Sequence, residues 1–369
     1  MENYLLPIKT AIILFPFLAL LFTLPYVLYQ YHKYGSIYWL RVGIVYSFLL
    51  YLLVAYFLVI LPLPPIEEVR NYTTPRMQLI PFDFVIDFIK NTSFRLNDFG
   101  TYWTALKEPY FYTFFYNILL CLPFGVYLHY YFRCNLKKTV LFTFLLSLFF
   151  ELTQLSGLYF IYPRGYRLFD VDDLLLNTFG GFIGYYVGSL FMRILPTREQ
   201  LDTKSYKLGV KVSWLRRITL FLLDIFIYSV INSLIISIFS SYSKIISLAI
   251  LFIYYVIIPY TLKGQTLGGK FLNVKIISTK EKLSFWQILI RQSLFYGIYF
   301  ISPFVAMIGI SILSTLDLKI LLFFIILVCL FVYFYLYFVS FIKALFMKKD
   351  LFYDKISHTK LASSIQIDE

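Results

Sequence analysis

The stretches LFTFLLSLFFELTQLSG (residues 141–157) and DLLLNTFGGFIGYYVG (residues 173–188) decide how this chain is interpreted. Both belong to apolar runs, 138–157 and 174–195, that are long enough to cross a bilayer as helices. Both also contain polar side chains at helical spacing, so that each pair shares one helix face. These polar residues are Glu151, Gln154, Asp173 and Asn177. Polar groups inside such runs indicate contacts between helices or a functional site.

The rest of the chain is equally apolar. Of its 369 residues 60% are hydrophobic and only 14% are charged, whereas soluble domains have about 25% charged residues. Backbone groups in lipid must be paired within their own segment, and runs of this length exclude the short strands of a barrel. We therefore predict an all-α polytopic membrane protein with about nine transmembrane helices. The predicted spans are 10–29, 39–61, 111–132, 138–157, 174–195, 217–239, 245–262, 286–313 and 319–342.

Basic residues predict the orientation of these helices. Alternate loops on one side carry about twice as many Lys and Arg residues as those on the other, and cytoplasmic loops are the basic ones. This places the N-terminus outside and the C-terminus inside, in a bacterial plasma membrane. The net charge of +13 then faces anionic headgroups. No basic stretch has the interleaved aromatic residues of a nucleic-acid platform, so the expected partners are membrane lipids and no nucleic acid.

Composition divides the chain into five parts. A helical hairpin is predicted first, then an extracytoplasmic segment that lies along the membrane interface, because its apolar residues near position 86 recur at helical spacing. A three-span unit, a cytoplasmic linker and a second membrane domain follow. The predicted bounds are 1–61, 62–110, 111–195, 196–212 and 213–369.

In the three-span unit the predicted orientation brings the polar residues to the outer side. Glu151 lies about 9 Å below its helix end, and Arg167 is the expected partner of its carboxylate. The residues of this outer cleft are Asn117, Glu151, Gln154, Arg167, Asp170, Asp173 and Asn177. Gly180, Gly184 and Gly188 form a smooth stripe that predicts close helix packing and carries no chemistry.

Three runs in this unit resemble the VanZ-like membrane family: NILLCLPFGVYL from residue 117, ELTQL from residue 151, and RLFDVDDLLLNTFGGFIGYYVG from residue 167. The resemblance covers about 111–195. It implies the same cleft residues, with Pro123, Gly125 and Gly180 in addition. It also implies an association with resistance to teicoplanin-type glycopeptide antibiotics, and it names no reaction.

The second membrane domain has its own polar pattern. LRRITLFLLDIFIYSV places Arg217 and Asp224 two turns apart on one helix face, where the cation is a possible partner for the buried carboxylate. The loop KGQTLGGK follows, then an alternating stretch compatible with a short strand pair, and then a helix that carries Arg291. Asp354 comes late in the tail. We expect these residues to meet at the inner face of the membrane.

This second pattern resembles the RDD family, over about 213–362. On that resemblance the inner-face site comprises Arg217, Asp224, Gly264, Thr266, Gly268, Lys270, Arg291 and Asp354. The tail departs from the family pattern, since Ser357, His358 and Thr359 follow the second Asp. Some RDD members are linked to sodium–proton exchange.

Together these patterns predict a cell-envelope protein that binds a lipid-linked wall precursor or a glycopeptide at the outer cleft and contributes to teicoplanin-type resistance. One alternative is a cation–proton exchanger that uses Glu151 and Asp224, because buried carboxylates carry ions across membranes. Another is a membrane enzyme that acts on a lipid-linked substrate. The sequence has no evident nucleophile and no three-ligand metal motif, so we expect no metal or cofactor and favour a non-enzymatic role. The competing structural interpretation is that the polar groups only join helices.

Overall fold

The computed structural model describes residues 2–239, 243–280, 282–296 and 351–366, with isolated helical positions between 324 and 342. The chain divides into two compact units. Unit 1 comprises Met1–Leu24 and Tyr38–Thr203, and unit 2 comprises Pro25–Ile37 and Lys204–Glu369. The division passes through two helices, α1 (Glu2–Tyr34) and α10 (Arg198–Gly209). The polar stretch predicted as a linker is therefore largely helical.

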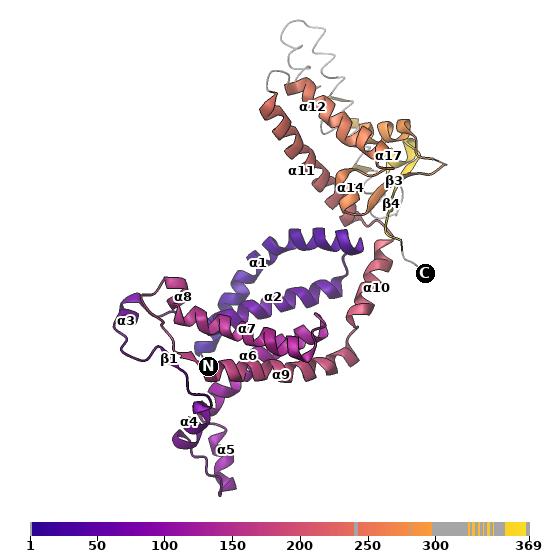
Figure 1. Ribbon diagram of the computed structural model, residues 1–369. Coiled ribbons are helices and arrows are strands. Elements are labelled where there is room, and N and C mark those ends of the chain that lie inside the picture. Colours follow the sequence, from indigo (N-terminus) through magenta and orange to yellow (C-terminus); the bar gives the residue numbers. More distant parts are fainter. Residues whose placement is uncertain are drawn as a thin grey trace. The chain divides into compact units, whose positions relative to one another are not determined.

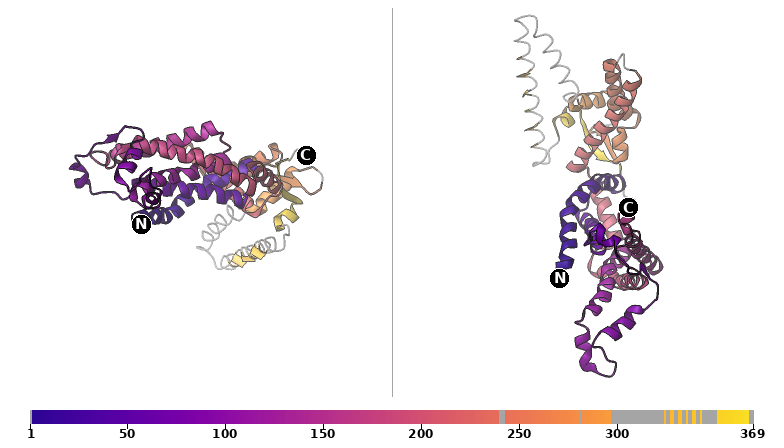
Figure 2. Two further views of the ribbon diagram at one scale, coloured as in Figure 1. Left: turned by 90° about the horizontal axis from the view of Figure 1, so that it is seen from below. Right: turned by 90° about the vertical axis from the view of Figure 1, so that its left-hand side faces the viewer.

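Unit 1 is built on long apolar helices. They are α2 (Trp39–Ile60), α6 (Pro109–Tyr130), α7 (Leu136–Leu155) and α9 (Val171–Ile194), besides the first part of α1. Helices α6, α7 and α9 run side by side (Figures 1 and 2), and α9 contacts both of the others. The three-span unit is thus a packed helical layer in which the predicted polar faces can meet.

Glycines allow α9 to approach its neighbours closely. A Cβ atom added at Gly180 or Gly184 would overlap a backbone carbonyl oxygen of α6, that of Ile118 or Leu122 respectively. A Cβ at Gly181 would overlap the side chain of Thr143 on α7. In lipid there is no hydrophobic driving force between helices, so they associate through van der Waals packing. Small residues favour this packing because they let the backbones approach closely.

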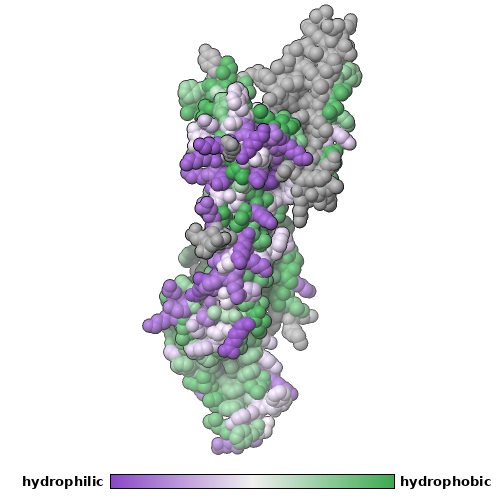
Figure 3. All heavy atoms as spheres, turned by 90° about the vertical axis from the view of Figure 1, so that its right-hand side faces the viewer, coloured by the Kyte–Doolittle hydropathy of each residue, from purple (hydrophilic) through white to green (hydrophobic). Residues whose placement is uncertain are grey.

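Short elements cover one end of unit 1. They are α3 (Ile66–Arg70), β1 (Met77–Gln78), α4 (Asp83–Asn91), η1 (Phe99–Thr101), α5 (Tyr102–Ala105), α8 (Gly157–Phe160) and β2 (Phe169–Asp170). Strands β1 and β2 pair in parallel. The helical spacing seen in the sequence does form a helix, α4, whose Val85, Ile86 and Ile89 are exposed. The bottom of Figure 3, where α4 and α5 lie, is largely apolar, and the placement of this segment along the membrane interface stays a prediction.

Unit 2 combines helices with a two-stranded sheet. After α10 come α11 (Trp214–Ile238), α12 (Ser243–Phe252), the π-helical turn η3 (Ile253–Ile257), α13 (Ile258–Thr261), α14 (Leu267–Phe271), β3 (Val274–Ser278), a helix over 285–296, α17 (Phe352–Ile356) and β4 (Thr359–Ser363). The expected strand of the alternating stretch is β3, but its antiparallel partner is β4 in the tail, with Val274 opposite Ser363. The local strand pair is therefore wrong, because the tail returns to this edge.

Six of the described helices are long and apolar enough to cross a membrane: Leu5–Tyr34, Trp39–Ile60, Pro109–Tyr130, Leu136–Leu155, Val171–Ile194 and Trp214–Ile238. Their outer faces carry apolar side chains such as Phe17, Leu20 and Leu21, which are more than two-thirds exposed. The seventh predicted span is a shorter apolar helix, Ile245–Thr261. The eighth and ninth predictions fall mostly outside the described residues. The chain is an all-α membrane protein, while nine spans and the orientation remain predictions.

Candidate functional site

Unit 1 contains a cavity of about 400 Å³ lined by residues of α2, α6, α7 and α9 and by Arg167 of the loop before β2. Six of the seven residues predicted for the outer cleft line it: Asn117, Glu151, Gln154, Arg167, Asp173 and Asn177. Apolar residues, among them Leu58, Leu120 and Phe150, complete its wall. We call this space the polar cavity. It combines two carboxylates and three amides from apolar helices with one guanidinium from a loop.

Side-chain hydrogen bonds join α9 to α6 and to α7 beside the cavity. The amide of Asn117 donates to Asp173. One turn further along α9, Asn177 donates to Ser147 of α7 at 2.9 Å, and the Ser147 hydroxyl donates to the carbonyl oxygen of Asp173 at 3.4 Å. The polar faces of α7 and α9 therefore oppose each other, as their spacing predicts.

Glu151 does not form the expected ion pair with Arg167. The Glu151 side chain is 2% exposed, and its Oε2 accepts a hydrogen bond from the backbone N–H of Asp170 at 3.0 Å. The Arg167 guanidinium instead donates to the carbonyl oxygens of Val59 at 2.7 Å and Leu61 at 2.6 Å. These carbonyls lie at the C-terminal end of α2, where a helix leaves its last carbonyl groups unpaired and favours positive charge.

Gln154 also contacts the end of α2, donating to the Val59 carbonyl oxygen at 3.0 Å. Helix α2 thus belongs to the wall of the polar cavity, although the sequence indicated only an accessory hairpin there. Its contribution is made by backbone oxygens and apolar side chains, which leave no motif in a sequence.

The side chains of Asp170 and Asp172, at the start of α9, accept hydrogen bonds from backbone N–H groups. The Asp170 carboxylate accepts from the N–H of Asp172 at 2.8 Å and so caps α9. Burial raises the pKa of the Asp170 carboxyl above its usual range. The Asp172 carboxylate accepts from the N–H groups of Phe82 at 2.6 Å and Phe84 at 2.9 Å, at the start of α4. Asp170 therefore does not line the cavity as predicted, and it contacts the cavity residue Glu151 through its backbone N–H.

In unit 2 a second, smaller cavity of about 50 Å³ is lined by Arg217, Asp224, Gly264, Thr266 and Arg291 together with apolar residues. Asp224 is 1% exposed, and its carboxylate accepts three hydrogen bonds from neutral donors. The donors are the Tyr254 hydroxyl at 2.8 Å, the Thr266 hydroxyl at 2.8 Å and the Gly268 N–H at 3.1 Å. Tyr254 lies on the π-helical turn η3, a feature frequent at functional sites.

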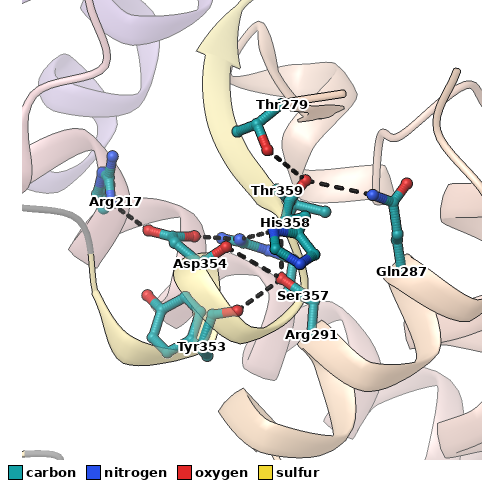
Figure 4. Close-up of polar contacts among 9 residues, drawn as sticks. All are labelled: Arg217, Thr279, Gln287, Arg291, Tyr353, Asp354, Ser357, His358 and Thr359. Atoms are coloured by element: carbon teal, nitrogen blue, oxygen red, sulfur yellow. Dashed lines mark hydrogen bonds and ion pairs between the residues drawn. The ribbon is translucent and has the colours of Figure 1, made fainter. Parts of the chain in front are cut away.

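The expected pairing of Arg217 with Asp224 is replaced by a different one. Asp354 lies between two arginines: Arg291 contacts one carboxylate oxygen and Arg217 lies 3.4 Å from the other (Figure 4). Arg291 also donates to the Thr359 hydroxyl at 2.9 Å. Both arginines therefore contact Asp354, the second Asp of the RDD pattern.

Of the remaining residues predicted for the inner-face site, Gly264 and Gly268 lie at the cavity or contact Asp224, and Lys270 does not. Gly264 has a positive φ of 94° and its Cα faces the Ile276 carbonyl oxygen, so that a side chain has no room there. The backbone of Gly268 contacts Asp224 directly. Lys270, by contrast, is exposed at the end of α14 and does not line the cavity.

Arg216 is a buried residue that the sequence did not single out. Its side chain is fully buried. Nε donates to the carbonyl oxygen of Leu272 at 2.9 Å, one terminal nitrogen to that of Gly209 at 2.8 Å, and the other to that of Asn273 at 2.7 Å. The first two carbonyls end helices α14 and α10. Arg216 thus joins separate elements of unit 2 through groups that helices leave unpaired.

These features define a multi-pass protein of the bacterial cell membrane with buried polar sites in two units. The family model described as VanZ/LLP1 matches residues 48–192, and the model of the RDD family matches residues 211–357. The chain therefore carries a VanZ-like domain followed by an RDD family domain. No curated protein and no solved structure matches it. The VanZ/LLP1 match includes most of α2, whose carbonyl groups contact Arg167.

Proposed function

We propose that the polar cavity binds the polar part of a lipid-linked wall precursor or of a glycopeptide, and that this cell-envelope protein thereby contributes to teicoplanin-type resistance. The observation that carries the proposal is the cavity of about 400 Å³, in which Glu151, Asp173 and the three amides surround one space inside apolar helices. Interhelical contacts alone need no such volume, since joined polar side chains pack against each other. The resemblance to the VanZ-like family supplies the antibiotic context.

The proposal includes the orientation expected from the basic loops. The cavity residues lie near the C-terminal end of α7 and the N-terminal end of α9. With the N-terminus outside, these ends belong to the outer leaflet, where a wall precursor or an antibiotic is available.

Replacing Glu151 with Gln tests this function, because the substitution keeps the shape and removes the charge. We expect purified Glu151→Gln protein in lipid nanodiscs to bind a lipid-linked wall precursor at least about tenfold more weakly, the loss of one hydrogen bond to a charged group. Glu67→Gln is the matched control, because Glu67 is an exposed acid of the same unit. In a strain whose resistance depends on this protein, Glu151→Gln should restore teicoplanin susceptibility. Unchanged binding and resistance in a normally expressed variant would contradict the proposal.

A second candidate function is cation–proton exchange, which Asp224 favours. Its carboxylate is nearly fully buried and accepts hydrogen bonds from neutral groups, as do carboxylates that bind and release protons or sodium in membranes. Everted vesicles that contain the full chain should then show sodium-dependent proton movement that Asp224→Asn abolishes. Vesicles that hold a proton gradient and show no such movement with the unaltered protein would remove this candidate.

A further inference from the structure

The hydrogen-bond donors of the polar cavity are engaged with the protein itself. The amide of Asn117 donates to Asp173, and the side chains of Gln154 and Arg167 donate to carbonyl oxygens of α2. The amide nitrogen of Asn177 donates to Ser147 at 2.9 Å. A ligand that needs many donors from the protein, such as a phosphate, therefore finds few that are uncommitted.

The acceptors of the cavity are used much less. Within the described part of the chain, the Glu151 carboxylate accepts one hydrogen bond and the Asp173 carboxylate accepts one, although an ionised carboxylate has about four acceptor positions. Asn177 is 3% exposed, and its Oδ1 has no hydrogen-bond partner among the described residues. Buried acceptors without donors are unfavourable, so the occupant of this space should supply several hydrogen-bond donors.

The charge of the cavity points the same way. Two carboxylates and one guanidinium line it, and the guanidinium already contacts carbonyl oxygens at the end of α2. An anionic ligand beside Glu151 and Asp173 would add like-charge repulsion in surroundings that screen it poorly. A primary ammonium group offers three donors and one positive charge, and it accepts nothing.

We propose that the polar cavity holds a primary ammonium group between Glu151 and Asp173, carried by an amphipathic molecule. This inference rests on the proposed function, because it specifies the ligand of the same site. The amphipathic character follows from another cavity of unit 1, with a volume of about 710 Å³. It shares Arg167 with the polar cavity, and its lining includes the apolar residues Met77, Leu79 and Ile80. The amine binds in the polar cavity, and the apolar part of the molecule remains in the 710 Å³ cavity or in the bilayer.

Two sources can present such an amine at a membrane surface: an ethanolamine headgroup, or the free amine of a lipid-linked wall precursor. Native mass spectrometry of the full-length protein counts bound molecules of each. The probes are phosphatidylethanolamine, its N-acetyl derivative, the lipid-linked precursor, and the same precursor with its amine acetylated. Each pair differs only in the charge and donor count of the amine.

We expect acetylation to weaken binding at least about tenfold in the pair that represents the true source, since it removes a charged hydrogen-bonding group. Glu151→Gln and Asp173→Asn should each weaken binding of the free amine to a similar extent, whereas Glu67→Gln should not. Circular dichroism and thermal unfolding establish that the variants are folded. Preference for free over acetylated phosphatidylethanolamine alone would assign the headgroup as the source, and preference in the precursor pair would assign the wall intermediate.

The outcomes separate this inference from the proposed function. Equal binding of the free and acetylated forms in both pairs, with weaker precursor binding by Glu151→Gln, would overturn the ammonium inference and leave the proposed function standing. No binding of any probe by the unaltered protein would overturn both. Equal loss with Glu67→Gln would show that binding depends on surface charge and would overturn the ammonium site.

Discussion

Replacing Arg216 with Met is expected to destabilise unit 2 by about 3 kcal/mol, because three buried carbonyl oxygens lose their charged donor together. For a unit of this size such a loss lowers the thermal midpoint by about 6–12 °C. Methionine fills similar space and restores none of the hydrogen bonds. Thermal unfolding of the purified full-length protein, followed by circular dichroism, measures the effect.

The neighbouring Arg217 provides the matched control. Its side chain is 22% exposed, and Asp354 keeps its contact with Arg291 when Arg217 is removed. We therefore expect Arg217→Met to cost about 1 kcal/mol or less, as partly exposed ion pairs do. A midpoint for Arg216→Met equal to or above that for Arg217→Met would refute the assignment of Arg216 as the residue that joins the elements of unit 2.

Replacing Gly184 with Ala is expected to destabilise unit 1 by about 2–3 kcal/mol. Its Cβ would overlap the backbone carbonyl oxygen of Leu122, and backbone on α6 cannot move aside as a flexible side chain would. The two helices must separate, which also alters the polar cavity. Retention of folded protein on heating, together with precursor binding, reports both consequences.

The same substitution at two other glycines, Gly188 and Gly43, provides controls for Gly184→Ala. Gly188 lies on the same stripe, but there a Cβ would approach His129 and Val126 no closer than 3.3 Å, so Gly188→Ala should cost far less. Gly43 on α2 has no heavy atom within 4 Å of an added Cβ. Gly43→Ala should therefore be neutral or stabilising by up to about 1 kcal/mol, the intrinsic helix preference for Ala. Equal effects at all three positions would mean that close approach to α6 is not the cause.

Much of the fold could be predicted because its signals are local. The apolar runs identified the six long helices, and spacing alone placed Glu151 with Gln154 and Asp173 with Asn177 on facing helices. The glycine stripe likewise predicted which face of α9 packs closely, since the absence of a side chain is visible in the sequence itself.

The partners of the charged groups could not be predicted in the same way. Arg167 contacts carbonyl oxygens of Val59 and Leu61, and every residue of the chain has such an oxygen. Only the position at which α2 ends leaves these particular carbonyls unpaired. Arg216 and Arg217 are adjacent and chemically identical, yet one is fully buried among carbonyl groups and the other contacts Asp354. That difference depends on where distant segments return.

The prediction of a local strand pair in unit 2 was wrong for a related reason. The alternating residues after Gly269 do form β3, but the partner strand comes from the tail more than eighty residues later, at Thr359–Ser363. A two-residue register can be read locally, whereas the choice of partner depends on chain topology. Asp354 reaches Arg291 through the same return of the tail.

The most direct test of the account is an electron cryo-microscopy map of the full-length protein in nanodiscs supplied with the lipid-linked wall precursor. We predict ligand density in the polar cavity, within hydrogen-bonding distance of Glu151 and Asp173, with the cavity open toward the outer leaflet. Density for the precursor elsewhere, or these side chains turned toward acyl chains or the cytoplasmic leaflet, would contradict it.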